Sequence, residues 1–177
     1  YTYVNGKSAF IQGAEVELRK DLDFISDRFK QFSAGINGFL IKSEVTLNDW
    51  AYYELAELGI VKDTKRPTSL SRPLQGQSPT VLNLNLRYKF DKEGNHTITL
   101  LYNEFGKRIH SVGGLGIPDT YERPVGIIDL VYNLKYQDRW NFKISGKNLN
   151  DTRVKIVQEI PALKQDQTVY SYRLGPT

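Results

Sequence analysis

The chain has 177 residues, 40% hydrophobic and 25% charged, which suits one folded domain and excludes a disordered or low-complexity protein. The mean hydropathy is −0.46, and no apolar run approaches the roughly 18 residues of a membrane-spanning helix. Strand-type membrane proteins stay possible, because their apolar residues alternate with polar ones. The chain has no cysteine, which excludes disulfide scaffolds, zinc–thiolate sites and cysteine nucleophiles, and its net charge of +4 is too small and scattered to indicate nucleic-acid binding.

Alternation of apolar and polar residues with a period of two dominates the sequence and predicts strands with two unlike faces. The clearest case is 82–90, where every even position is apolar or aromatic and the residues between are Asn, Arg or Lys. We expect about eight strands in an antiparallel meander. The segments with this pattern are 14–19, 32–37, 82–90, 97–103, 128–136 and 140–145.

The connections between these strands alternate in length. Short ones are expected near 21–28, 91–95 and 137–139, and long ones near 44–75, 112–123 and 158–167. The longest is expected to hold a short helix from Trp50 to Leu58, followed by a polar loop over 65–73 without a strand.

Aromatic residues flank two of the short turns. Tyr88 and Phe90 precede the turn at 91–95, and Tyr136 and Trp140 enclose the turn at 137–139. All four belong to the apolar face, and Tyr and Trp residues gathered at one height of a barrel wall are typical of a membrane interface. Aromatic residues at the edge of the core of a soluble sandwich would give the same pattern, so alternation alone leaves both interpretations open.

Signatures of an enzyme are weak, and no catalytic, cofactor or metal site is predicted. His96 and His110 are 14 residues apart, or about 45 Å along an extended strand, too far to share a metal. The glycines at 113–116 are followed by Pro118 instead of a helix, which argues against a phosphate loop. Asp119 and Glu122 are interpreted as solvated loop acids.

The segment 44–63 carries five acids against Lys62 alone, a net charge of −4. Together with Trp50, Tyr52 and Tyr53 it forms an acidic, aromatic loop that could meet a cation or stack on a flat ligand or sugar. A solvated loop helix is the simpler interpretation.

Several sequence blocks resemble the C-terminal barrel region of TonB-dependent outer-membrane receptors. The resemblance lies in their order and spacing over about residues 9–173, since no single motif is diagnostic. The blocks are GAEVELRK at 13–20, IKSEV at 41–45, RPLQGQSP at 72–79, NLNLRY at 83–88, LYNEFGKRI at 101–109, VG at 112–113, IPDTYERP at 117–124 and KNLND at 147–151.

This resemblance implies that residues 1–177 are a partial segment of a large outer-membrane β-barrel. In the family, an N-terminal plug domain fills the barrel and the TonB complex drives uptake of a scarce solute of the siderophore-iron, cobalamin or glycan class. The chain has no methionine and lacks the plug, the TonB-contacting box and the final strand, so we expect a fragment of such a receptor, located in the bacterial outer membrane.

The resemblance also assigns the two faces of the strands. The following apolar residues are expected to contact lipid: Leu82, Leu84, Leu86, Ile128, Leu130, Leu134, Phe142 and Ile144. The following polar residues are expected to face the lumen and the plug: Asn83, Asn85, Arg87, Thr97, Thr99, Asn141 and Lys143. Candidate ligand contacts at the extracellular rim are Trp50, Tyr52, Tyr53, Arg108, His110, Tyr121, Glu122 and Arg123.

Three alternative functions stay open at this point. A soluble β-sandwich binding module would bury the leucine faces against a second sheet. A non-transporting structural or adhesive barrel would share the wall but not the plug. An enzyme on a β scaffold would need a nucleophile and a base close together, and Ser78 and Ser111 lack the sequence context of a nucleophile.

Overall fold

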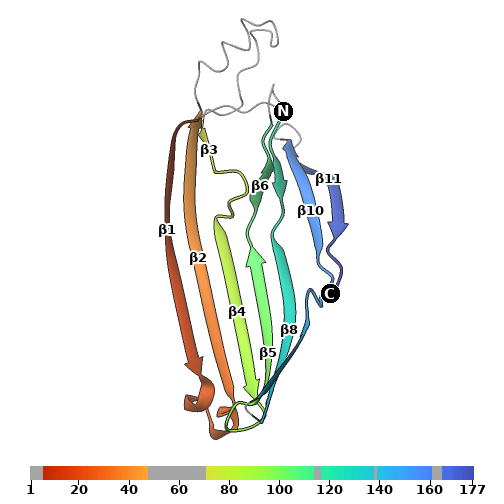
Figure 1. Cartoon of the computed structure of the whole chain (residues 1–177). Helices are drawn as coiled ribbons and strands as arrows, with labels where there is room; N and C mark the ends of the chain where they lie inside the picture. Colours follow the sequence, from red (N-terminus) through yellow and green to blue (C-terminus); the bar gives the residue numbers. More distant parts are fainter. Residues whose placement is uncertain (1–5, 48–70, 114–116, 138, 161–164) are drawn as a thin grey trace, which may run out of the picture.

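The computed structural model describes residues 6–47, 71–113, 117–137, 139–160 and 165–177, and strands dominate these ranges (Figure 1). Two short 3-10 turns, η1 (Leu22–Phe24) and η2 (Asp27–Phe29), join the first two strands. The strands are β1 (Gly6–Asp21), β2 (Phe32–Leu47), β3 (Ser71–Arg72), β4 (Thr80–Lys89), β5 (His96–Phe105), β6 (Arg108–Ser111), β7 (Thr120–Glu122), β8 (Val125–Tyr136), β9 (Trp140–Gly146), β10 (Arg153–Ile160) and β11 (Gln165–Arg173).

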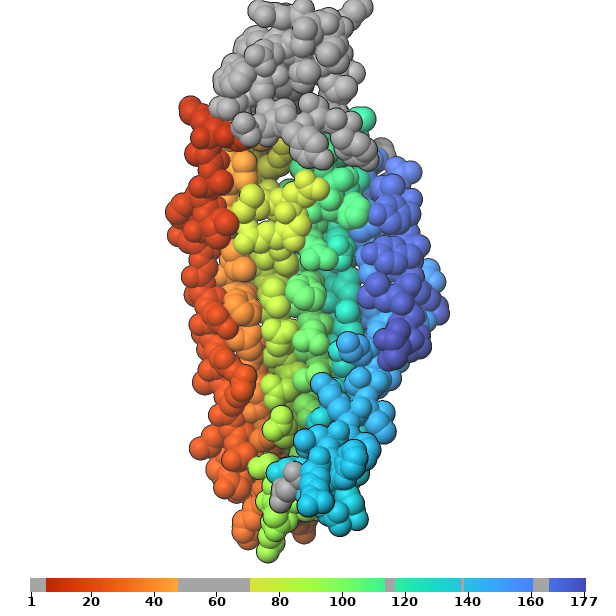
Figure 2. All heavy atoms as spheres, viewed as in Figure 1, coloured from red at the N-terminus to blue at the C-terminus, as the bar shows by residue number. Residues whose placement is uncertain are grey.

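All strand pairs are antiparallel. One sheet has the order β1-β2-β4-β5-β8-β9 with β3 beside β2, and a smaller sheet has the order β11-β10-β7-β6. β6 continues β5, β8 continues β7 and β10 continues β9 after short breaks, so neighbours in space are also neighbours along the chain. The predicted antiparallel meander is confirmed, and Figure 2 shows the strands side by side as one wall from β1 in red to β11 in blue.

Two details of the connections differ from the prediction. β10 runs to Ile160 and β11 begins at Gln165, so the connection expected over 158–167 is short. Its polar residues looked like a loop, but Glu159 and Asp166 lie in strands and pair with basic residues across the sheet. Ser71 and Arg72 form a short strand beside β2, where a loop was expected. A hydrogen bond from the Ser71 hydroxyl to Glu44 of β2 adds to this backbone pairing. The expected helix at 50–58 lies outside the described residues.

The strand register gathers the apolar side chains on one face of the larger sheet. Partners in antiparallel strands share a face. Leu84 lies between Ile36 of β2 and Tyr102 of β5, and Tyr102 is opposite Ile128 of β8. The next row joins Leu86, Leu100 and Leu130 in the same way. All eight residues predicted to contact lipid therefore lie on this one face, which we call the apolar face.

The apolar face is open to the surroundings. Leu84 is 37% and Ile144 69% exposed, while Leu130 and Leu134 are half-buried between their cross-strand neighbours. No second layer covers this face in the described part of the chain. An apolar face of this size on a folded protein marks an interaction surface or a membrane contact.

The apolar face is limited at both ends along the direction of the strands. Tyr136 and Ile128 on β8 are separated by eight residues, or about 26 Å of strand. Beyond Leu40 on β2 and Tyr102 on β5, the same face carries the charged side chains of Lys42 and Glu104. At the opposite end, near the short turns, aromatic rings replace the aliphatic side chains on this face.

These rings form a continuous ladder across β2, β4 and β8. The ring centroids of Phe32 and Tyr88 are 4.7 Å apart, those of Tyr88 and Phe90 4.9 Å, and those of Phe90 and Tyr132 6.5 Å. Phe29, in the turn before β2, extends the ladder at 5.8 Å from Phe32. Tyr88 and Phe90 thus lie at one level of the wall, next to a short turn, as the sequence indicated.

The break between β9 and β10 has its own supports. Asn148 is 5% exposed, with a left-handed φ of 52°. Its side chain donates to the carbonyl oxygen of Gly175 at 3.0 Å and accepts from the amide of Thr152 at 3.0 Å. Asn150 donates to the carbonyl oxygen of Gly126, where the β8–β9 ladder has ended. The KNLND block therefore satisfies backbone groups that the departing strand leaves unpaired.

Candidate lumen face and rim

The face opposite the leucines is polar across the larger sheet, and we call it the polar face. Arg87 lies opposite Thr99, and Lys89 lies opposite Thr97. The register carries this face on through Asn133 to Lys143. The seven residues predicted to face the lumen all fall on the polar face: Asn83, Asn85, Arg87, Thr97, Thr99, Asn141 and Lys143.

Amide side chains connect the strands in the middle of the polar face. Asn37 donates to Glu15 at 2.7 Å, and Asn83 donates to Asn37 at 3.1 Å. Gly35 lies opposite Asn85 in the register. A Cβ on Gly35 would clash with the side-chain amide of Asn85, so glycine leaves the room that this amide needs against β2.

A hollow of about 450 Å³ opens on the polar face beside these amides. Arg19, Asn85, Arg87 and Thr99 are among its lining residues. Thr99 is 8% exposed, and its hydroxyl has no hydrogen-bond partner among the described residues. A buried hydroxyl without a partner is uncommon in a folded protein and points to a group that completes the site.

The predicted rim residues are held by partners on neighbouring strands. Arg108 donates to both carboxylate oxygens of Glu122 at 3.0 Å. The hydroxyl of Tyr170 lies 2.8 Å from Nε2 of His110. These contacts tie β6 to β7 and to β11, and the paired geometry of Arg108 and Glu122 explains their positions without a ligand.

Tyr121 of β7 and Arg123, the residue after its end, are held in the same way on the other face of the sheet. Lys107 lies over the ring of Tyr121 at 4.2 Å and pairs with Glu159, while Arg123 pairs with Asp166. Tyr121 shares its face with Val157, whereas Glu122 shares the opposite face with Ile156. The structure therefore does not bring all predicted rim residues to one site.

Three further charged partners at the rim were missed from the sequence: Lys107, Glu159 and Asp166. Glu159 lies 52 residues from Lys107, and no spacing rule connects residues so far apart. Trp50, Tyr52 and Tyr53 lie outside the described residues.

The turn between β4 and β5 contains a carboxylate whose contribution to the stability of the turn depends on pH. The Asp91 carboxylate accepts from the amides of His96 and Asn95, each at 3.0 Å. The bond from His96 is the main reason that the pKa of Asp91 lies below its ordinary value of 3.8. Because folding lowers this pKa, the ionised carboxylate stabilises the turn at pH values above the ordinary pKa of 3.8. This stabilisation is lost as the pH falls through the lowered pKa of the folded state.

We expect the hydrogen-exchange protection of the His96 amide, corrected for intrinsic rates, to fall as the pH drops below about 4. In Asp91→Asn this step should disappear, because the amide side chain does not titrate. Glu93→Gln, in the same turn, serves as the control. The same step in Asp91→Asn would show that another group controls the turn.

No group of three or more residues that could hold a metal ion occurs in the described ranges. The described residues also contain no helix of the length and apolarity needed to cross a membrane. No protein-family model, curated protein or solved structure matches the chain.

Proposed function

We propose that this chain is part of the wall of an outer-membrane receptor of the TonB-dependent class. In this proposal the apolar face contacts lipid and the polar face lines the lumen, where an N-terminal plug domain of the same protein packs. The receptor would take up a scarce solute of the siderophore-iron, cobalamin or glycan class, with energy from the TonB complex.

One observation carries the proposal: an exposed apolar face that spans six adjacent strands, with a polar face behind it and an aromatic ladder at its end. Wide antiparallel sheets with this division are typical of outer-membrane barrels, whose apolar band is flanked by aromatic rings. The resemblance of the sequence blocks adds the transport class to this picture.

The alternative of a soluble β-sandwich needs a second sheet over Leu84 and Leu86. Both side chains are exposed, and no second sheet in the described ranges covers them. A structural or adhesive barrel without transport has the same wall, so a transport assay on the whole receptor must distinguish it.

These 177 residues contain no cysteine, so a thiol introduced into β4 has no native thiol beside it within them. Spin labels would be attached one at a time to cysteines at positions 83–88 of β4, in the whole receptor in lipid vesicles. We expect oxygen, which dissolves in the bilayer, to collide more often with labels at 84, 86 and 88. A water-soluble nickel complex should collide more often with labels at 83, 85 and 87.

The collision rates with oxygen and with the nickel complex should each alternate along β4 with a period of two residues, and the two patterns should be out of phase. Labels on β1 at Val16 and Glu17 form a matched pair two strands away from β4, and they should repeat the pattern. Collision profiles without this period would contradict the lipid-facing wall, and a reversed phase would mean that lipid contacts the polar face.

A further inference from the structure

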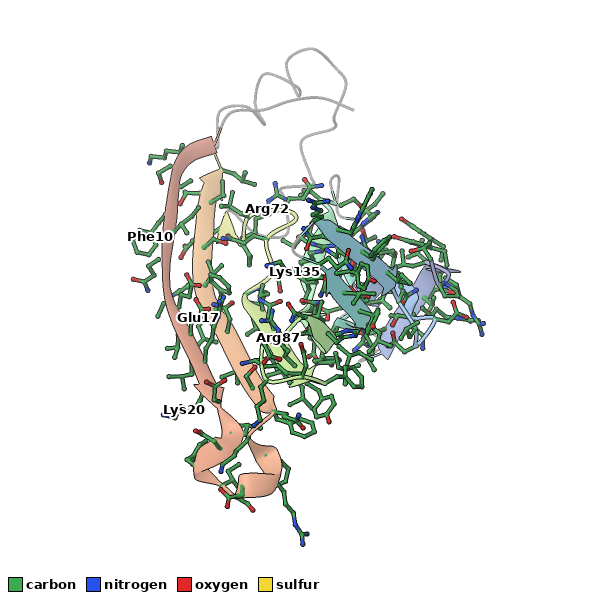
Figure 3. All side chains as sticks on the ribbon, turned by 60° about the horizontal axis from the view of Figure 1, so that its bottom comes forward. Phe10, Glu17, Lys20, Arg72, Arg87 and Lys135 are labelled. Carbon is green, nitrogen blue, oxygen red and sulfur yellow. The ribbon has the colours of Figure 1, made fainter. Side chains whose placement is uncertain are left out.

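A group of cations lies at the turn end of the polar face. We call it the basic band: Arg87 and Lys89 of β4, Lys135 of β8 and Lys143 of β9. The register places Lys89, Thr97, Asn133 and Lys143 in one row across four strands, and Lys135 two residues beyond Asn133 on β8. Figure 3 shows Arg87 and Lys135 in the space between β2 and β8, while Phe10 points away from β1 on the other side.

The described acids of the polar face do not pair with Arg87, Lys89 or Lys143 of this band. Glu17 pairs with Arg19, Glu15 accepts from Asn37, and Asp129 accepts from the amide of Asn148. Asp21, opposite Ser33, is two strands away from Arg87, or about 10 Å.

Within the described ranges, Arg87, Lys89 and Lys143 form no ion pair. Three unpaired cations on one face create a positive potential that favours an acidic partner.

The hollow on the same face points to the same chemistry. Arg87 and Thr99 lie opposite each other in the register and both line the hollow. The buried Thr99 hydroxyl lacks an acceptor among the described residues. A carboxylate placed here would accept from the hydroxyl and pair with the guanidinium, which satisfies both groups.

We infer that the basic band is the docking surface for an acidic segment of the polypeptide that fills the lumen, with one carboxylate seated against Arg87 and Thr99. This inference rests on the proposed function, which turns the polar face away from lipid. The row from Lys89 to Lys143 spans three strand spacings, or about 14 Å. That width suits several carboxylates along a chain better than one small anion.

Carbodiimide cross-linking tests the inference in the whole receptor within outer-membrane vesicles. The reagent joins a lysine amine directly to a carboxylate that touches it. Mass spectrometry should find Lys89 and Lys143 joined to Asp or Glu of the same polypeptide, outside these 177 residues. Lys42 provides the control, because it is exposed and lies on the opposite face.

Amine acetylation supplies a second readout. Lys89 and Lys143 should react about tenfold more slowly than Lys42 while the lumen is filled, because covered groups react only after local opening. Lys89→Glu combined with Lys143→Glu should make the lumen-filling segment sensitive to protease at a lower urea concentration. The matched double Arg variant should keep the wild-type profile.

Rapid acetylation of Lys89 and Lys143 would overturn the inference, and so would cross-links to a separate protein, or protection that needs only added inorganic phosphate. These outcomes differ from a failure of the proposed function. If the proposed function is wrong, the spin-label profile along β4 should lose its period of two or reverse. An error in the docking partner alone would leave that profile unchanged.

Discussion

Leu84→Arg is expected to destabilise the proposed receptor in lipid vesicles by about 2–4 kcal/mol, the cost of an arginine on a lipid-facing strand near the bilayer midplane. Leu84 lies in the middle of the apolar face, between Ile36 and Tyr102. An arginine there must carry its charge into the hydrocarbon layer or distort the bilayer around it. The measurement is reversible urea unfolding of the whole receptor in vesicles.

Asn85→Arg is the matched control, because it places the same charge on the same strand one residue further. Its side chain lies on the polar face beside Arg87, where water or a polar partner can solvate the guanidinium. We expect it to cost much less than Leu84→Arg, and the same comparison applies to Leu86→Arg. A larger cost for Asn85→Arg would reverse the assignment of inside and outside.

Asn148→Ala should have the second large effect, a loss of about 3 kcal/mol of unfolding free energy from two lost hydrogen bonds and backbone strain. The change leaves the carbonyl of Gly175 and the amide of Thr152 without their partner. It also forces alanine into the left-handed region at a φ of 52°.

Asn148→Gly separates the two contributions to this effect. Glycine adopts the positive φ without strain but makes neither bond, so about 1 kcal/mol should return relative to Asn148→Ala. Asn141→Ala, at an exposed asparagine of the polar face, should change unfolding little. Equal stability of Asn148→Ala and wild type would mean that the hydrogen bonds at this break do not hold the two strand halves together.

The alternation of residue types was sufficient to predict most strands and their faces. Leu101 and Val131 interrupted the apolar–polar pattern, yet the register places both on the polar face among Asn85 and Thr99. The pattern succeeded because a period of two fixes which side chains share a face, once neighbouring strands pair in sequence order.

The kinks and the rim contacts could not be predicted in this way. The break around Pro124 has a local cause, since proline has no N–H to donate to the ladder. The break after Gly146 depends instead on Asn148 and Asn150, which bond to backbone groups of distant segments. The pair of Lys107 with Glu159 likewise joins strands that meet only in the folded sheet.

Under the proposed function, the length of the apolar strand from Tyr136 to Ile128 on β8 has a consequence for the kind of membrane that suits this wall. About 26 Å of apolar strand, tilted by roughly 40° as in outer-membrane barrels, covers a height of about 20 Å. Such a short span matches a thin bilayer, and the bacterial outer membrane is thinner than average. In a thicker bilayer, the lipid must thin locally around the protein or meet the carboxylate of Glu104, so hydrophobic mismatch would favour one membrane of the cell over the other.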